Sequence, residues 1–502
     1  MAPALRTLQE SVDVVSLKIL GEHFTRKYRE PKVIRDAVLG FHKIDPHFFV
    51  LIDSPFFQRL RRLHQTALAL HTYPSATHTR FEHSLGVFTI ASRMLDAIEI
   101  NHKFRGTAAH VIGKTDRLTV QTAALLHDIS HGPFSHSSED VYGRNPVFDQ
   151  IRSEEPNTFA DASASEIMGW CLLHSSGFKP IWEAFLVQCG RSVSLRNVTR
   201  MIVGDYEQLP TSMRALQSIV NGPVDADKLD YIARDGHFTG LVMPIDLERL
   251  LQGLLVDSVS NPEGEESVEL VVDSAAIAAL EQMVFARAQL YTQLYHHHKV
   301  RASTQLIQRL IVEIQKHGLG QDPANLLNFD DDSLLAYART NLAKTLVNRL
   351  KLRGLPERCL VLSVSSFASE EEDPATQDRL GWGALRRELT KSASAVSKAE
   401  NEIADGAKVV ATDVMLDVPR SPKFLMLRQP LIRLWKRHVV SLSEVFPVPG
   451  WETAHETYLS VSYVMTTNIP ARRAIASGAR DWLARRDPSI KIKDDALRQA
   501  KL

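Results

Sequence analysis

Four residues in three distant segments constrain this chain more than any other feature. His83, the adjacent pair His127–Asp128 and Asp227 combine two imidazoles with two carboxylates. Neutral imidazole suits divalent transition metals, and carboxylates add harder oxygen ligands. Four protein ligands leave coordination positions open for water and substrate, as in a catalytic metal site. The set predicts a fold that brings these segments together around one cation, and it indicates hydrolysis.

Each of these residues lies in a short, distinctive string. The strings read HTRFEHSLGV (78–87), TAALLHDISHGPFSH (122–136) and PVDADKLDYIARD (223–235). Nine of the twenty histidines lie between His64 and His136. Such clustering is more often catalytic or metal-binding than structural, although any single histidine is more often an ordinary hydrogen-bonding residue.

Length and composition indicate a soluble protein with two or three domains, or one large helical domain with appendages. The 502 residues have a formal net charge of zero, so no global attraction to nucleic acid or an anionic membrane is indicated. Nine Lys/Arg against four Asp in 471–502 favour a solvated helical tail over a polyanion-binding arm. Three cysteines without metal or redox spacing, and no long apolar run, predict a cytoplasmic protein.

The pattern from 32 to about 318 is predominantly helical. Helices are predicted over 83–98 and 117–130, and Gly132 and Pro133 place the His127–Asp128 pair near a helix C-terminus. A β-hairpin is predicted within 251–272, and a helix from 275 to 317, either single or kinked near the histidine run.

The C-terminal part reads as a smaller α+β region. We predict a helix over 328–350, a strand in the stretch that follows it, a flexible acidic loop over 366–381, and strands over 407–416 and 457–465. The predicted fold class is mostly α, with an N-terminal extension at 1–31, a catalytic core at 32–320 and an α+β region at 321–502.

The strings resemble those of the HD-domain metal-dependent phosphohydrolases. More narrowly, residues 52–87 and the string LLHDISHGPFSH are similar to the deoxynucleoside triphosphate triphosphohydrolases, and the resemblance covers about residues 32–320. It implies an HD-domain helical phosphohydrolase core with His83, His127, Asp128 and Asp227 as ligands of a divalent metal, which could be Mn, Fe, Ni, Zn or Mg.

The resemblance also implies catalytic roles. His131 falls where the family has a histidine that protonates or activates groups at the scissile phosphate, and Glu139 falls where a carboxylate orients it. An exposed surface charge is the alternative for Glu139. Asp161 stands where the family usually has a second catalytic histidine, and a carboxyl group with an ordinary pKa near 4 is a weaker acid–base partner at neutral pH. The sequence is therefore also compatible with a reduced or altered activity relative to the family.

Substrate contacts are implied for a further set, whose members would hold phosphates, sugar or base. For Arg80 an ordinary ion pair is the alternative. Four of these side chains, Arg287, Tyr291, Tyr295 and His298, have the spacing of one helical stripe. They offer a cation, two phenols and an imidazole, and either His297 or His298 could supply the imidazole. The set comprises Gln65, Arg80, His136, Lys228, Tyr231, Asp235, Arg287, Tyr291, Tyr295 and His298.

The predicted function is metal-dependent hydrolysis of deoxynucleoside triphosphates to deoxynucleoside and triphosphate. Relatives assemble into oligomers, so a homo-oligomer is expected. Arg59, Arg61 and Arg62 could belong to a site for a regulatory nucleotide, but for at least one of them a solvated surface charge is the favoured interpretation. Two alternatives stay open. One is a phosphodiesterase or phosphatase for another phosphate ester, including nucleic-acid ends, and the other is a nucleotide sensor with little turnover.

Overall fold

The computed structural model describes residues 1–22, 26–105, 112–190, 193–260, 266–363, 366, 382–391, 393–419, 430–434, 438–446, 450, 461–486 and 492. These residues form two compact units, each built from several separate stretches of the chain. The first comprises 1–287, 311–339 and 426–446, and the second comprises 288–310, 340–425 and 447–502. The predicted linear boundaries at 31 and 320 stay a prediction.

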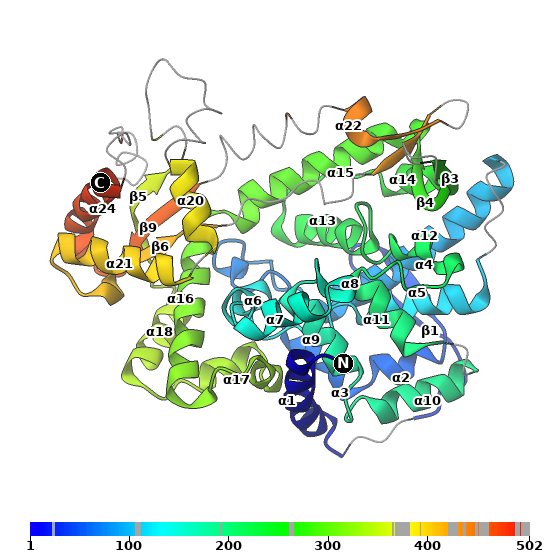
Figure 1. Cartoon of the computed structure of the whole chain (residues 1–502), viewed down its shortest axis with the longest axis horizontal. Helices are drawn as coiled ribbons and strands as arrows, with labels where there is room; N and C mark the ends of the chain where they lie inside the picture. Colours follow the sequence, from blue (N-terminus) through cyan, green and yellow to red (C-terminus); the bar gives the residue numbers. More distant parts are fainter. Residues whose placement is uncertain are drawn as a thin grey trace. The chain divides into compact units, whose positions relative to one another are not determined.

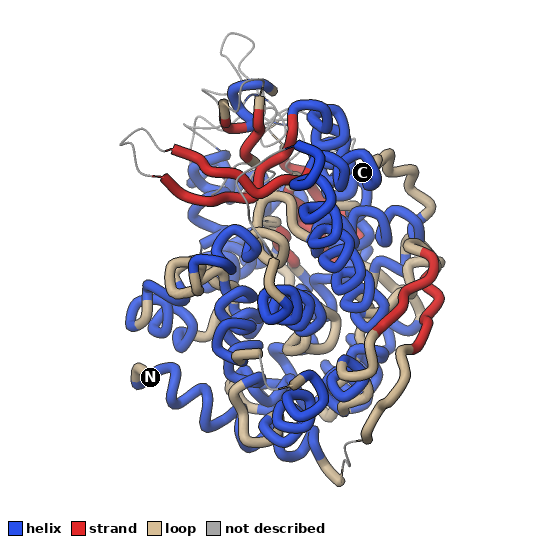
Figure 2. Tube along the Cα trace, turned by 90° about the vertical axis from the view of Figure 1, so that its right-hand side faces the viewer, coloured by secondary structure: helices blue, strands red, loops and turns tan. Residues whose placement is uncertain are grey.

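The fold class is confirmed, since helices dominate the described chain (Figures 1 and 2). The helices that belong wholly to the first unit are α1 (Pro3–Leu20), α2 (Phe48–Ile52), α3 (Pro55–Gln58), α4 (Arg80–Arg105), α5 (Lys114–Leu126), α6 (His136–Tyr142), α7 (Pro146–Glu154), α8 (Pro156–Phe159), α9 (Ala164–Leu173), α10 (Lys179–Cys189), α11 (Leu195–Val203), α12 (Thr211–Gln217), α13 (Ala226–Thr239), α14 (Leu247–Gly253), α17 (Asp331–Ala336) and α22 (Leu442–Val445). Within the described residues, no helix is long and apolar enough to cross a membrane.

Two small sheets belong to the first unit. The predicted hairpin is confirmed as β3 (Leu254–Ser260) and β4 (Glu266–Asp273), which pair antiparallel. Two strands that the sequence did not reveal, β7 (Leu431–Arg433) and β8 (Val439–Ser441), extend it to the order β3-β4-β7-β8, with β4 and β7 parallel. A further antiparallel hairpin, β1 (Lys32–Asp36) and β2 (Gly40–Ile44), lies in a stretch predicted to be helical.

The segment 275–317 was predicted to be either one helix or a helix kinked near the histidine run. The structure shows the second, since the helix is interrupted there. The segment comprises α15 (Ile277–Leu290), a π-helical turn at Tyr291–Tyr295 and α16 (His298–Ile314). The amide of His296 donates to the carbonyl of Tyr291, five residues back. This bonding changes the helical register, so the single stripe expected from Arg287 to His298 is wrong as a continuous α-helical face.

The helix predicted over 328–350 is in fact two, α17 and α18 (Asn341–Lys351). Each has its own N-cap: the side chain of Asp330 accepts from the amide of Ser333, and that of Thr340 accepts from the amide of Ala343. An N-cap residue has extended backbone angles, so Thr340 ends any continuous helix at that point.

The second unit is an α+β arrangement. Its sheet has the antiparallel order β5 (Glu357–Leu362), β9 (Ser462–Thr466) and β6 (Met415–Asp417), and its helices include α20 (Trp382–Lys391), α21 (Ala393–Ala407) and α24 (Arg472–Arg486). The strand after 350 is confirmed as β5. The strand over 407–416 is wrong in extent, since α21 runs to Ala407 and β6 begins at Met415. Of the strand over 457–465, residues 457–460 lie outside the described residues, as does the acidic loop 366–381 apart from Ser366.

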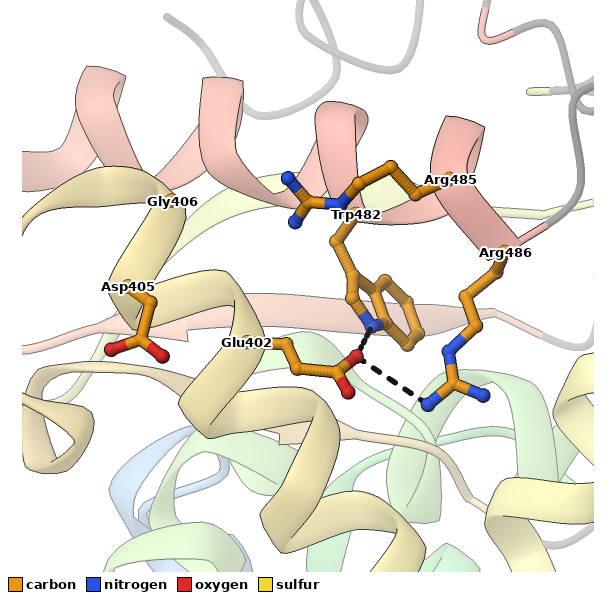
Figure 3. Close-up of a pocket in the computed structure, with 6 residues that line it drawn as sticks. All are labelled: Glu402, Asp405, Gly406, Trp482, Arg485 and Arg486. Atoms are coloured by element: carbon orange, nitrogen blue, oxygen red, sulfur yellow. Dashed lines mark hydrogen bonds and ion pairs between the residues drawn. The ribbon is translucent and has the colours of Figure 1, made fainter.

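Helices α21 and α24 approach closely, and glycine makes this possible. A Cβ atom on Gly478 would lie 2.8 Å from the carbonyl oxygen of Ile403. Beside this crossing, Trp482 donates through Nε1 to Glu402 at 2.8 Å, and Arg486 lies 3.4 Å from the same carboxylate (Figure 3). Two carboxylates and two guanidinium groups line this surface hollow with Gly406 and Trp482, so its charges largely offset one another.

Candidate metal centre

The four predicted ligands converge within the first unit. His83 lies in the first turn of α4, His127 caps the C-terminus of α5 with Asp128 directly after it, and Asp227 lies in the first turn of α13. His83, His127 and Asp128 offer ligand atoms that all lie within 4.8 Å of one another. Asp227 Oδ1 lies 3.0 Å from His83 Nε2 and 3.8 Å from His127 Nε2.

Both imidazoles present the same nitrogen to this cluster. His83 Nδ1 lies 2.8 Å from Asp230 Oδ2, and His127 Nδ1 lies 2.9 Å from the carbonyl oxygen of Ala124. If each Nδ1 carries the proton, each Nε2 has a free lone pair. Both Nε2 atoms are buried and make no hydrogen bond among the described residues. Two unsatisfied imidazole nitrogens facing two carboxylates fit a divalent cation.

The charges of the cluster favour a bound cation. Burial alone would lower the pKa of His83, but Asp227 and Asp230 raise it to about 10. Burial would raise the pKa of Asp128, yet the neighbouring Arg80 holds it well below its ordinary range. The carboxylates are thus kept ionised, as a metal ligand must be.

Arg80, which was predicted to contact a substrate phosphate, lies directly beside this cluster. It is 1 % exposed, pairs with Asp128 through NH1 and donates through Nε to Ser135 Oγ at 2.8 Å. Its NH2 group is buried without a partner among the described residues. Ser135 and the preceding Phe134 have positive φ angles of 52° and 57°. Such strained backbone is concentrated at functional sites, and here it holds the hydroxyl group that orients Arg80.

His131 lies beside the cluster, where a catalytic group was predicted. Its Nε2 is 3.1 Å from Asp128 Oδ1, and its Nδ1 is buried without a partner among the described residues. Burial and the positive charge of Arg80 lower the pKa of His131 to about 4. The lowered pKa favours the neutral imidazole at pH 7.

Glu139 was predicted to orient His131, but its hydrogen bonds go to other residues. It accepts from the amide and the hydroxyl group of Ser165 at 3.0 and 2.7 Å, and it pairs with the exposed His136 at 2.9 Å. Burial would raise the pKa of Glu139, but His136 lowers it. These three groups, His131, His136 and Glu139, form a second cluster within 4.8 Å. The charge of Arg80 next to it favours an anion there over another cation.

Several predicted substrate contacts are engaged elsewhere in this structure. Lys228 is buried and bonds to Asp225 and to the carbonyl oxygen of Gly222, so a contact with phosphate requires this pair to open. Asp235 pairs with the buried His78 at 2.8 Å. Asp161 is exposed and does not belong to either cluster of possible metal ligands found among the described residues.

The remaining predicted contacts stay predictions. The backbone N–H of Gln65 donates to the His78 carbonyl, and the side-chain oxygen of Gln65 is buried without a hydrogen bond in the described part of the chain. Tyr231 is half-buried on α13. Arg287 belongs to the first unit, whereas Tyr291, Tyr295 and His298 belong to the second. The rings of Tyr291 and Tyr295 lie 5.2 Å apart.

The three arginines considered for a regulatory nucleotide each have a partner within the protein, but they differ in burial. Arg59 is 5 % exposed and donates to the carbonyl oxygens of Ile129 and His131. Arg61 stacks on Phe81, and Arg62 pairs with Asp330. Arg59 is thus buried and supports the loop that carries His131. Arg61 and Arg62 are exposed, which agrees with a solvated surface charge for at least one of the three. A regulatory nucleotide site at this cluster stays a prediction.

Sequence reasoning also missed residues that hold the cluster from behind. Asp230 bonds to His83, and Arg234 bonds to Asp230 through Nε and NH2 at 2.8 and 2.9 Å. Their spacing gave a usable signal, since Asp227, Asp230 and Arg234 are three and four residues apart on α13 and therefore lie on adjacent turns.

Comparison with known proteins agrees with this geometry. Residues 80–176 match the model of the HD domain, and residues 245–449 match that of the HD associated region. The chain therefore carries an HD domain and an HD associated region. The His127–Asp128 pair lies within the residues that match the HD domain.

Individual relatives can be named. The human deoxynucleoside triphosphate triphosphohydrolase SAMHD1 is 30% identical over 282 residues, which are 53% of this chain and 42% of SAMHD1. Uncharacterized proteins from Methanocaldococcus jannaschii and Bacillus subtilis (YwfO) are 31% and 29% identical over 66% and 57% of this chain. These matches span 60% and 56% of the two proteins, so the chain covers about half the length of its curated relatives.

The fold is also found in a solved structure. A hypothetical protein from Aquifex aeolicus superposes with a TM-score of 0.61 over 89% of this chain and 99% of its own, at 20% sequence identity. At that identity the likeness supports the fold alone.

Proposed function

We propose that this protein hydrolyses deoxynucleoside triphosphates to deoxynucleoside and triphosphate, with a divalent metal held by His83, His127, Asp128 and Asp227. The observation that carries the proposal is the pair of buried, unsatisfied Nε2 atoms facing two carboxylates beside Arg80. Human SAMHD1, a relative at 30% identity, is a deoxynucleoside triphosphate triphosphohydrolase, which supports this choice of substrate.

The bound metal would supply Lewis acidity and a water of lowered pKa. The protein supplies the rest. Arg80 is fixed by Asp128 and Ser135, and its unpartnered NH2 group can donate to an oxygen of the phosphate chain. A charge-assisted bond of this kind is stronger than a neutral one and becomes stronger still in a buried site.

His131 is placed to move one proton. A triphosphate beside Arg80 would offset the positive charge that lowers the pKa of His131, so the imidazole could take up a proton at the partnerless Nδ1. From there the proton passes to the departing 5′ oxygen of the sugar as its bond to the α-phosphorus breaks. Asp128 holds the other nitrogen, Nε2, at 3.1 Å and so fixes the ring.

The test is a product assay on purified protein with each of the four deoxynucleoside triphosphates and with Mn, Fe, Ni, Zn or Mg. We expect triphosphate and nucleoside in equal amounts, with ¹⁸O from labelled water in the triphosphate. Asp128→Ala should abolish turnover. His131→Asn should lower kcat by about 10²- to 10⁴-fold while metal binding remains.

Other products would contradict the proposal. Pyrophosphate with a nucleoside monophosphate would indicate a different bond broken, and cleavage of other phosphate esters alone would favour a phosphodiesterase or phosphatase. Saturable nucleotide binding without turnover under every metal would favour a sensor. Equal kcat in wild type and His131→Asn would remove His131 from the mechanism.

A further inference from the structure

A chain of buried charged groups connects His83 to the hairpin β1–β2. His83 Nδ1 lies 2.8 Å from Asp230 Oδ2, and Arg234 holds both oxygens of Asp230. The third guanidinium nitrogen, NH1, donates to Asp36 Oδ2 at 2.9 Å. Asp36 is the last residue of β1 and is far from the other three in sequence.

All four side chains in this series are shielded from solvent. The exposed fractions of the side chains are 1 % for His83, 0 % for Asp230, 1 % for Arg234 and 7 % for Asp36. A buried guanidinium between two carboxylates has a defined orientation because its planar fork matches their geometry. Removing one partner leaves a buried charge uncompensated, which is costly.

Asp36 connects this series of charged groups with the turn of the hairpin β1–β2. Its Oδ1 accepts hydrogen bonds from the amides of Val38 and Leu39, both at 2.8 Å, which close the turn between β1 and β2. Its Oδ2 holds Arg234. One carboxylate therefore links the turn with the guanidinium, so the turn and the α13 side chains cannot move independently without breaking these bonds.

We propose that Asp36 and Arg234 are positioning residues of the metal centre, acting through Asp230 to fix the tautomer and ring orientation of His83. The proposal rests on the metal site proposed above. A proton held on Nδ1 by Asp230 leaves Nε2 as the donor atom facing Asp227 and Asp128. By this route the hairpin β1–β2, which contributes no ligand, becomes part of the centre.

The test is Co²⁺ titration of the metal-free full-length chain, followed by the visible absorption of the bound ion. The variant Asp36→Asn keeps an oxygen for the Val38 and Leu39 amides and removes the charge facing Arg234. We expect its Co²⁺ affinity to fall by about 10-fold, within the range of 10- to 100-fold seen for groups behind metal ligands, and its absorption spectrum to change. Arg35→Gln, an exposed change on the same strand, should match wild type.

A second variant distinguishes a loss of metal-centre geometry from a general folding defect. Arg234→Lys keeps the charge but loses the planar fork, and it should weaken Co²⁺ binding while circular dichroism of the metal-free protein is unchanged. Wild-type affinity and spectrum in both Asp36→Asn and Arg234→Lys would overturn the positioning role and leave the metal site intact. Failure of the wild-type chain to bind Co²⁺ would overturn the metal site itself, and this proposal with it.

Discussion

At the scale of single residues, the environment of each carboxylate decides what it can do. Asp128 and Asp227 stay ionised beside Arg80 and His83. Glu166, on α9, behaves in the opposite way. Burial raises its pKa from the ordinary 4.5 to about 7, against the hydrogen bonds from Ser163 that lower it.

Glu166 therefore makes stability depend on pH. Because the folded state binds this proton more tightly than the unfolded state, its contribution is complete below about pH 4.5 and is lost as the pH rises towards 7. Relative to wild type, Glu166→Gln should gain as much as about 3 kcal/mol in unfolding free energy between pH 4.5 and 8. Urea denaturation at several pH values measures this. The exposed Glu183→Gln should show no such trend, and a pH-independent difference for Glu166→Gln would contradict the account.

The residues that could be predicted were those that touch the proposed metal. His83, His127, Asp128 and Asp227 lie in recognisable strings, and they converge as expected. Asp36 and Arg59 could not be predicted, because the partners that define them are over 190 and about 70 residues away, respectively. A lone charged residue in a sequence carries no sign of such a pairing.

At the scale of elements, the proposed metal centre depends on the close approach of α4 and α13. Gly86 lies one turn after His83, and a Cβ atom there would lie 1.9 Å from Asp230 Oδ1 and 2.4 Å from Arg234 NH2. Only glycine leaves room for the ion pair that supports His83.

Gly86→Ala should therefore damage both stability and metal binding. We expect a loss of about 1–3 kcal/mol in unfolding free energy and a weaker affinity for Co²⁺, because Asp230 must move away from His83. Thermal unfolding and metal titration measure the two effects. Gly354→Ala, where the nearest atom would lie 3.7 Å from the new Cβ, is the matched control. Unchanged metal affinity in Gly86→Ala would contradict this role for the helix approach.

Elements could be predicted where the pattern is local. The hairpin β3–β4 and the break before α16 follow from turn residues and periodicity. Strands β7 and β8 are three residues each; they pair with one another, and β7 joins the sheet by pairing with β4, which is far away in sequence. A strand that short has no measurable alternation of its own, so only the tertiary pairing reveals it. The hairpin β1–β2 was missed because its apolar residues do not follow the alternation of burial: Val33 and Phe41 are exposed.

At the scale of the whole molecule, the proposed ligands all come from one compact unit. In the other unit, Asp417 is 1 % exposed and accepts from Arg301 at 2.6 and 2.9 Å and from Gln305 at 2.8 Å. This buried carboxylate connects β6 with α16 inside the second unit.

Asp417→Ala should separate stability from metal binding. Leaving Arg301 without its carboxylate should cost about 3–5 kcal/mol in the unfolding of the second unit, because a buried charge loses its partner. Affinity for Co²⁺ should stay within experimental error of wild type, since His83 and its neighbours are untouched. Calorimetry and metal titration on the same preparation test this. A parallel loss of metal affinity would show that the centre depends on the second unit.

The most direct test of the central claim is an anomalous difference map from crystals of the full chain grown with Mn²⁺. The account predicts one peak bounded by His83 Nε2, His127 Nε2 and the carboxylates of Asp128 and Asp227. A well-ordered map with those side chains in place and no peak among them, at a Mn²⁺ concentration that supports turnover, would contradict it.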